Sequence, residues 1–133
     1  MNNYLVAVFL AALVPITGCV SLAPEDSGCA GATVRRINIV YQRHSKITVA
    51  PPSRYASPGD AIEYRVKGPE ARLFNSTGTS GPGSFAWLDA SGPGNSRGNS
   101  YFVCVPKNAN TGDYEYLVEI DGVGTLDPVV HVE

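Results

Sequence analysis

The segment Ile62-Glu63-Tyr64-Arg65-Val66-Lys67 decides the fold class, because apolar and charged residues alternate along it without a break. Side chains of a β-strand point to opposite faces in turn, so this pattern is typical of a strand with one face in a core and the other in solvent. Ser57-Pro58-Gly59-Asp60, just before it, is a turn signal. We therefore expect a strand that follows a turn and buries Ile62, Tyr64 and Val66.

Similar patterns recur along the chain from residue 33 onward. Strands are expected at about residues 35–41, 47–49, 71–75, 114–120 and 126–132. The run 101–105 is apolar at every position, which is typical of a central strand buried on both faces. Pro128 cannot donate to a ladder, so the last strand is expected at a sheet edge or after this residue. No stretch of the chain beyond the N-terminal region shows a sustained helical period.

The composition suits a small β-domain and argues against one class of partner. The 133 residues include 14 Gly and 10 Pro, more turn-forming residues than a helical bundle would carry. Ten basic and 12 acidic residues give a net charge of −2, which argues against binding to nucleic acid. We expect an all-β domain over residues 33–133, an antiparallel two-sheet β-sandwich of roughly seven or eight strands.

The N-terminal region carries the pattern of an export signal. Residues 5–14 are all apolar, a run too short for a membrane-spanning helix, which needs about 20 residues. Ile16-Thr17-Gly18-Cys19 follows and resembles the lipobox of bacterial lipoproteins. The resemblance implies that residues 1–18 are a signal peptide and that Cys19 becomes a lipidated N-terminus, held at a membrane by several acyl chains. The alternative is an ordinary signal peptide that contains a cysteine.

The residues after Cys19 bear on location. Residues 19–32 are expected to be the lipidated cysteine and a short polar tether. Val20 stands where an Asp would favour retention in the inner membrane of enteric bacteria. The lipoprotein resemblance therefore implies a bacterial cell-envelope protein, lipid-anchored in the outer membrane.

The chain has three cysteines, an odd number that needs an explanation in an exported protein. If Cys19 carries lipid, Cys29 and Cys104 remain for a disulfide, which an oxidising compartment permits. Closing so long a loop would contribute about 4 kcal/mol in the chain-entropy model. The alternative is that Cys104 is a thiolate that binds a metal.

The last third of the domain resembles a cupredoxin sandwich through Tyr101-Phe102-Val103-Cys104-Val105-Pro106, an apolar strand that ends in Cys-x-Pro. A blue-copper site needs two His, a Cys and usually an axial Met. Lys107 stands where that family has a His, the only Met is Met1, and the imidazoles are His44 and His131. The resemblance therefore implies a cupredoxin-like frame, and we expect no metal site and no cofactor.

A second resemblance is to immunoglobulin-like sandwiches. Asn110-Thr111-Gly112-Asp113-Tyr114-Glu115-Tyr116 is similar to the Gly-x-Tyr corner of those domains, in which the Tyr hydroxyl caps nearby backbone. Tyr116 stands where these domains often have a Cys, so a Cys29–Cys104 bridge would be a different tie. The strand pattern alone does not separate the two families.

Residues 75–100 are rich in Gly and Ser, and Ser-Gly-Pro-Gly occurs at 80–83 and again at 91–94. The two copies flank an apolar island that contains Phe85 and Trp87. One interpretation is a short strand with both aromatic side chains partly in the core, since Trp is usually well buried. The other is a binding loop that exposes them.

The sequence carries no recognisable catalytic motif: Gly-x-Ser-x-Gly, a phosphate-binding Gly-Lys-Ser/Thr loop and Cys-x-x-Cys are absent. Arg35, Arg36, Arg43 and Lys46 form a basic run, interpreted as a solvated strand face or as a contact with anionic headgroups. We expect a non-enzymatic, lipid-anchored protein that binds or scaffolds another envelope component. The alternatives are a metal or redox protein that uses Cys104, His44 and His131, and a small hydrolase that pairs a Ser with one of the two His.

Overall fold

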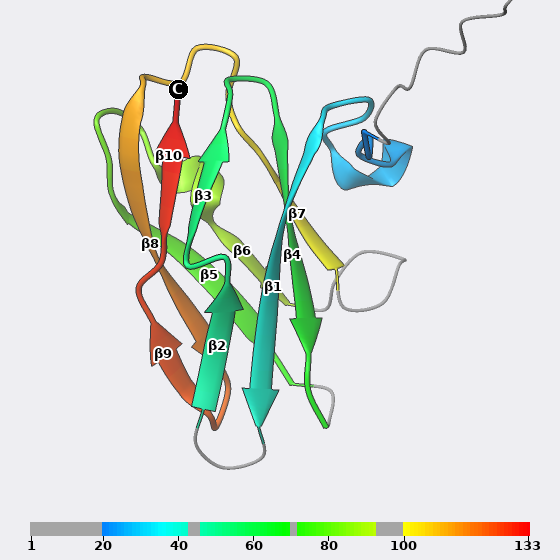
Figure 1. Ribbon diagram of the computed structural model, residues 1–133, viewed down its shortest axis with the longest axis vertical. Coiled ribbons are helices and arrows are strands. Elements are labelled where there is room, and N and C mark those ends of the chain that lie inside the picture. Colours follow the sequence, from blue (N-terminus) through cyan, green and yellow to red (C-terminus); the bar gives the residue numbers. More distant parts are fainter. Residues whose placement is uncertain (1–19, 43–45, 70–71, 93–99) are drawn as a thin grey trace, which may run out of the picture.

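The computed structural model describes residues 20–42, 46–69, 72–92 and 100–133, and these form two β-sheets packed face to face (Figure 1). The helical elements of this part of the chain are two short 3-10 turns, η1 (Glu25–Ser27) and η2 (Ala86–Leu88). None of the described helical segments has the length and apolar character needed to cross a membrane. The predicted all-β sandwich is confirmed.

The first sheet has four strands in the order β2-β1-β4-β7. Its members are β1 (Val34–Gln42), β2 (Lys46–Ala50), β4 (Ala61–Lys67) and β7 (Ser100–Cys104). β4 contains the alternating segment that predicted the fold, and Ile62, Tyr64 and Val66 are buried as expected. β7 ends this sheet in the described chain, so residues 101–105 lie at an edge and not at the predicted central position.

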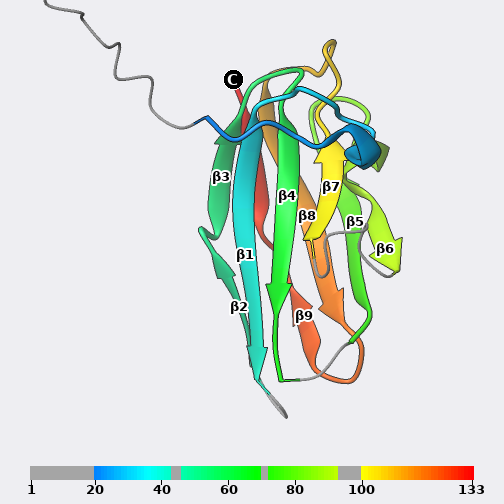
Figure 2. The ribbon, with the colours of Figure 1, turned by 90° about the vertical axis from the view of Figure 1, so that its right-hand side faces the viewer.

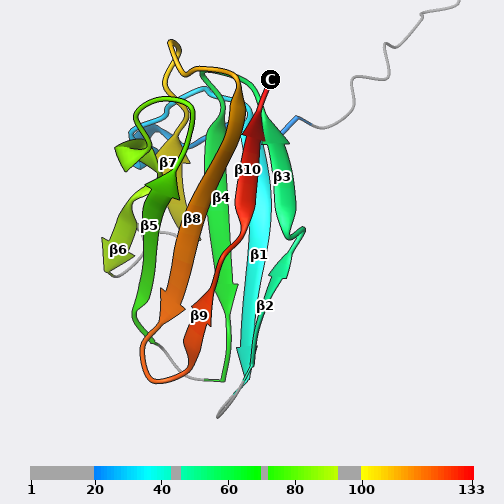
Figure 3. The same cartoon turned by 90° about the vertical axis from the view of Figure 1, so that its left-hand side faces the viewer.

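The second sheet has six strands, and Figure 3 shows it from outside. Its order is β3-β10-β8-β5-β6, with β9 paired to β8. Its members are β3 (Ser53–Ala56), β5 (Phe74–Ser80), β6 (Ala90–Gly92), β8 (Gly112–Ile120), β9 (Gly124–Leu126) and β10 (Val129–Val132). The described chain thus has ten strands, more than the seven or eight expected.

Both sheets are mixed, which corrects the antiparallel prediction. β1 pairs with β4 in parallel, and β10 pairs with β3 in parallel. β2 and β3 follow one another in the chain but belong to different sheets, because the chain crosses between the layers at Pro51-Pro52. The turn at Ser57–Asp60 then reverses the chain and returns it to the first sheet, where β4 runs in the same direction as β1.

The core lies between the two layers and is rich in aromatic side chains. Its largest fully buried members are Tyr64, Tyr114, Tyr116, Phe74, Ile37, Ile39, Ile62, Leu88, Ile120, Val118 and Val130. Apart from Leu88 of η2, they come from alternate positions of strands in both sheets, as the period of two predicts.

Residues 20–33 lie across one end of the four-stranded sheet on its outer face (Figure 2). Ala23 N donates to Ala32 O at 2.8 Å, and Val34 N donates to Ser21 O at 2.8 Å. Ala23 also packs with Cys29 and Ala61 in a small buried cluster. From Ser21 onward, the segment expected to be a tether is therefore hydrogen-bonded into the domain.

Candidate functional site

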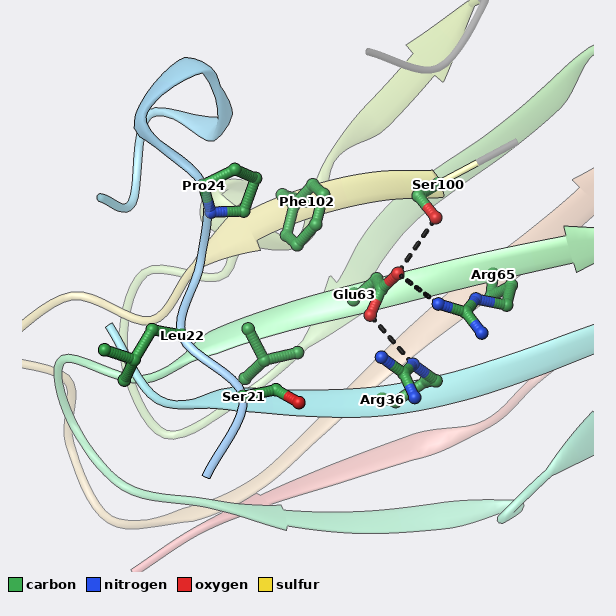
Figure 4. A pocket seen from close by; sticks show the side chains of 9 residues that line it. Ser21, Leu22, Pro24, Arg36, Glu63, Arg65, Ser100 and Phe102 are labelled. Atoms are coloured by element: carbon green, nitrogen blue, oxygen red, sulfur yellow. Dashed lines mark hydrogen bonds and ion pairs between the residues drawn. The ribbon is translucent and has the colours of Figure 1, made fainter. Parts of the chain in front are cut away.

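A pocket of about 320 Å³ lies where the N-terminal segment meets the outer face of the four-stranded sheet (Figure 4). We call it the basic pocket. It is lined by Ser21, Leu22, Pro24, Val34, Arg36, Glu63, Arg65, Ser100 and Phe102. β1 and β4 supply the charged side chains, and β7 supplies Ser100. The N-terminal segment and Phe102 supply most of the apolar side chains.

Glu63 is at the centre of this pocket. It occupies an outward position of β4, yet only 4% of the residue is exposed. Its Oε2 accepts a hydrogen bond from Arg36 Nε at 2.9 Å, and its Oε1 accepts from Ser100 Oγ at 2.9 Å and from Arg65 Nη2 at 3.3 Å. Three neighbouring strands thus place a donor on one carboxylate, as the dashed lines in Figure 4 show.

The surroundings of Glu63 keep it ionised. Burial alone would raise the pKa of its carboxyl, because it disfavours the charged form. Hydrogen bonds from Arg36 and Ser100, with the charges of Arg36 and Arg65, outweigh burial and hold the pKa below its usual value. The carboxylate is therefore charged at neutral pH and fixes both guanidinium groups.

The pocket keeps a net positive charge, because two arginines face one carboxylate. The side chains of Arg36 and Arg65 are each 39% exposed. A guanidinium group has five N–H donors, and each arginine directs one nitrogen at Glu63. The remaining donors suit recognition of a carboxylate or phosphate, which guanidinium binds through paired hydrogen bonds.

A second hollow, of about 310 Å³, shares Ser21, Val34 and Arg36 with the basic pocket. It adds Val20, Thr33, Arg35 and Arg54. Arg35 pairs with Asp60 at 3.0 Å. Arg54 Nε is buried without a hydrogen-bond partner in the described structure. The two hollows flank the start of the N-terminal segment and extend the positive charge around it.

The structure brings Cys29 and Cys104 together at disulfide distance, with their Cα atoms 5.5 Å apart. Tyr101, Val103 and Val105 point into the core, so Cys104 points outward, where Cys29 of the N-terminal segment meets it. The bridge fastens this segment to β7. Cys19, the predicted lipidation site, lies outside the described residues.

The residues of this chain do not fit a blue-copper site. Cys104 is bonded to Cys29 on the outer face of one sheet, whereas His131 belongs to β10 in the other sheet. His44 lies outside the described residues. Within the described ranges, no group of three or more His, Cys, Asp or Glu side chains is placed to hold a metal ion. Cys104 and His131, the ligands named for the alternative metal or redox protein, are therefore not brought together.

His131 has neighbours of its own. Its Nδ1 is hydrogen-bonded to Asp113 Oδ1, and its ring stacks on Tyr55 with 4.8 Å between ring centroids. All three residues belong to the six-stranded sheet, whereas the polar groups of the basic pocket lie on the other sheet. His131, one of the two histidines considered for hydrolysis, is thus separate from the charged pocket.

Trp87 and Phe85, the two aromatic residues of the apolar island, differ in how far they are exposed. Trp87 is partly buried in η2 and packs edge-on against Tyr114, with ring centroids 5.2 Å apart. Phe85 is 36% exposed. The interpretation of both residues as exposed binding aromatics therefore fits Phe85 better than Trp87, and neither lines the basic pocket.

Sequence reasoning missed the basic pocket, since it assigned Glu63 and Arg65 to a solvated strand face. Two signals pointed toward it: Arg36 belongs to the basic run noted in the sequence, and the apolar outward residue Phe102 in the run 101–105 required some cover. That cover is the N-terminal segment and not a neighbouring strand.

Comparisons with known proteins give a likeness in fold. No protein-family model matches the chain, and no curated protein matches it. It is similar to the oxidized form of plastocyanin from Dryopteris crassirhizoma, with 14% identity and a TM-score of 0.46 over 74% of this chain and 100% of that chain. It is also similar to a point mutant of amicyanin in its reduced Cu(I) form at pH 4, with 19% identity and a TM-score of 0.44 over 77% of this chain and 83% of that one. Both are cupredoxins, and the likeness concerns the sandwich fold alone.

Proposed function

We propose that this chain is a lipid-anchored, non-enzymatic protein of the bacterial cell envelope, whose sandwich binds another envelope component at the membrane surface. The sequence Ile16-Thr17-Gly18-Cys19 supports the anchor through its resemblance to a lipobox. Val20, in place of an Asp, supports the outer membrane as the location in a Gram-negative cell.

One observation carries the proposal: the folded domain begins directly after the cysteine that would be lipidated. Ser21 accepts a backbone hydrogen bond from Val34, and Leu22 bridges to Thr33. An anchor at Cys19 would therefore hold the four-stranded sheet at the membrane without a flexible spacer. Arg36, which lines both hollows, lies beside this point.

A binding role is supported over catalysis by how the chemical groups are distributed. The carboxylate in the basic pocket is held ionised by two arginines, which makes it a poor proton donor near neutral pH. The His131–Asp113 pair belongs to the other sheet. The pocket therefore offers fixed charges and an apolar wall, which are features of recognition.

The anchor is tested by expressing the full chain in a Gram-negative host and measuring the mass of its N-terminal peptide. We expect a mature chain that begins at Cys19 and carries a diacylglyceryl group and an amide-linked acyl chain. Cys19→Ser should abolish both the lipid and the cleavage, whereas Ser21→Ala, a matched change two residues away, should leave both intact. An unacylated mature N-terminus in the parent chain would rule out the anchor.

A further inference from the structure

We propose that the envelope component recognised by this domain is the anionic phospholipid surface itself, and that the outer face of the four-stranded sheet lies against it. This inference rests on the proposed lipid anchor and names the partner of the basic pocket. We call this surface the basic face and define it by Arg36, Lys46, Arg65 and Lys67.

The basic face follows from the alternation of the strands. Lys46 precedes the buried Ile47 on β2, and Lys67 follows the buried Val66 on β4, so both lysines point away from the core. Arg36 and Arg65 are on the same side, since both reach Glu63. Glu63 cancels one of these four positive charges, and Glu25 and Asp26 of η1 add two exposed carboxylates at one end of the same face. The strands β1, β2 and β4 themselves remain cationic on this side.

The opposite face of the sandwich has the opposite sign. Asp113, Glu115 and Glu119 on β8 alternate with buried residues and are exposed on the outer side of the six-stranded sheet. The whole chain has a net charge of −2, so the positive charge on the four-stranded sheet is opposite in sign to the charge of the protein as a whole. This separation of charge would turn one sheet toward an anionic surface and the other away from it.

The start of the folded chain is on the same side as the positive charge. Val20 is the next residue after Cys19, and it lines the second hollow together with Arg35, Arg36 and Arg54. Val20 and Leu22 are 63% and 60% exposed, which leaves two aliphatic side chains uncovered at this point. An acylated Cys19 would bring these aliphatic groups and the arginines to the headgroups together.

The distance between the basic face and the membrane determines whether its charges attract anionic headgroups. Electrostatic attraction to a charged surface decays over a Debye length of about 8 Å at physiological salt. A long flexible tether would place the basic face beyond that range, but the hydrogen bond from Val34 N to Ser21 O and the Cys29–Cys104 bridge fix the segment to the sheet. In the basic pocket, Arg36 and Arg65 retain donors that suit a lipid phosphate, and Leu22 and Phe102 supply apolar contact.

The test uses the mature lipoprotein, purified from membranes and reconstituted into vesicles of phosphatidylcholine alone or with phosphatidylglycerol. An amine-acylating reagent followed by mass spectrometry reports the accessibility of Lys46 and Lys67. The variant Thr77→Lys adds a matched probe at an exposed, outward position of β5 on the acidic side. Flotation with the vesicles reports the lipid anchor separately.

On anionic vesicles, we expect labelling of Lys46 and Lys67 to fall several-fold relative to neutral vesicles and to recover in high salt. Labelling of the lysine introduced by Thr77→Lys should stay constant. If labelling of Lys46, Lys67 and the introduced lysine is each the same on anionic and neutral vesicles while flotation is intact, the inference is overturned and the anchor stands. Failure of the parent chain to float with neutral vesicles would overturn the anchor and, with it, this inference.

Discussion

Tyr114 and Tyr116 both point into the core from β8, but their hydroxyl groups have different surroundings. Tyr114 Oη donates to Asn110 O at 2.8 Å, which confirms the predicted tyrosine corner at the start of the strand. Tyr116 Oη is buried without a hydrogen-bond partner in the described structure. Burial and the neighbouring Tyr64 raise the pKa of Tyr116, so its hydroxyl stays neutral and uncompensated.

This difference predicts opposite effects from the same substitution. Tyr114→Phe should lower the free energy of unfolding by about 1 kcal/mol, because it removes a hydrogen bond and leaves the carbonyl of Asn110 without its donor. Tyr116→Phe should be neutral or stabilising, since it removes a polar group that is buried without compensation. Urea unfolding of both variants measures this, and equal destabilisation by the two would contradict it.

For single residues, the sequence predicted an environment that depends on neighbours along the chain, but not one that depends on residues distant in sequence. The corner at Tyr114 depends on residues within one short motif, and sequence reasoning found it. The burial of Glu63 depends on residues 21–34, which fold back over it, so alternation alone marked it as solvent-exposed. The predicted pairing of Cys29 with Cys104 joins the same distant segments, but the count of cysteines and the lipobox resemblance at Cys19 were enough to propose it.

Among the elements, η2 shows how a short turn is fixed to a strand. Ser76 Oγ donates to Leu88 O at 2.8 Å, and Gly78 N donates to Asp89 Oδ1 at 2.8 Å. A Cβ atom at Gly78 would lie 2.3 Å from the carbonyl oxygen of Phe85. β5 therefore needs a glycine where the turn approaches it.

Gly78→Ala should displace η2 from β5 and lower the free energy of unfolding by about 1–3 kcal/mol, because the clash is with backbone and not with a flexible side chain. The emission of Trp87, the only tryptophan, should also change, since its contact with Tyr114 depends on this turn. Thr77→Ala, at an exposed position of the same strand, should change stability by less than about 0.5 kcal/mol. An unchanged emission spectrum in Gly78→Ala would contradict the predicted displacement.

Most strands were predictable from alternation, but the pairing of the sheets was not. Pro51-Pro52 follows β2 directly, and nothing in the sequence showed that the chain changes layer there and continues as β3. That crossing makes β4 parallel to β1, and the antiparallel prediction failed for this reason. β7 was predicted to be a central strand because its residues are apolar on both faces. Its outer face is covered by the N-terminal segment, and this cover produces the same apolar pattern in the sequence as a central position would.

For the molecule as a whole, the Arg36–Glu63–Arg65 cluster links folding stability to pH. A carboxyl whose pKa is lowered by folding contributes stability above its unfolded pKa, which is about 4.3 for Glu. That contribution disappears as the pH falls through the lower folded value. Protonation of Glu63 would also leave two arginines facing each other beside the pocket.

We therefore expect the free energy of unfolding to fall below about pH 4, with part of the loss due to Glu63. Glu63→Gln should lower stability at neutral pH and flatten the acid side of the profile, because the amide cannot take up the proton that Glu63 binds on unfolding. Glu119→Gln removes an exposed carboxylate from the opposite face and should leave the acid slope nearly unchanged. Urea unfolding measured across a pH series separates the two variants, and an acid slope in Glu63→Gln as steep as in the parent chain would show that this carboxylate does not couple folding to pH.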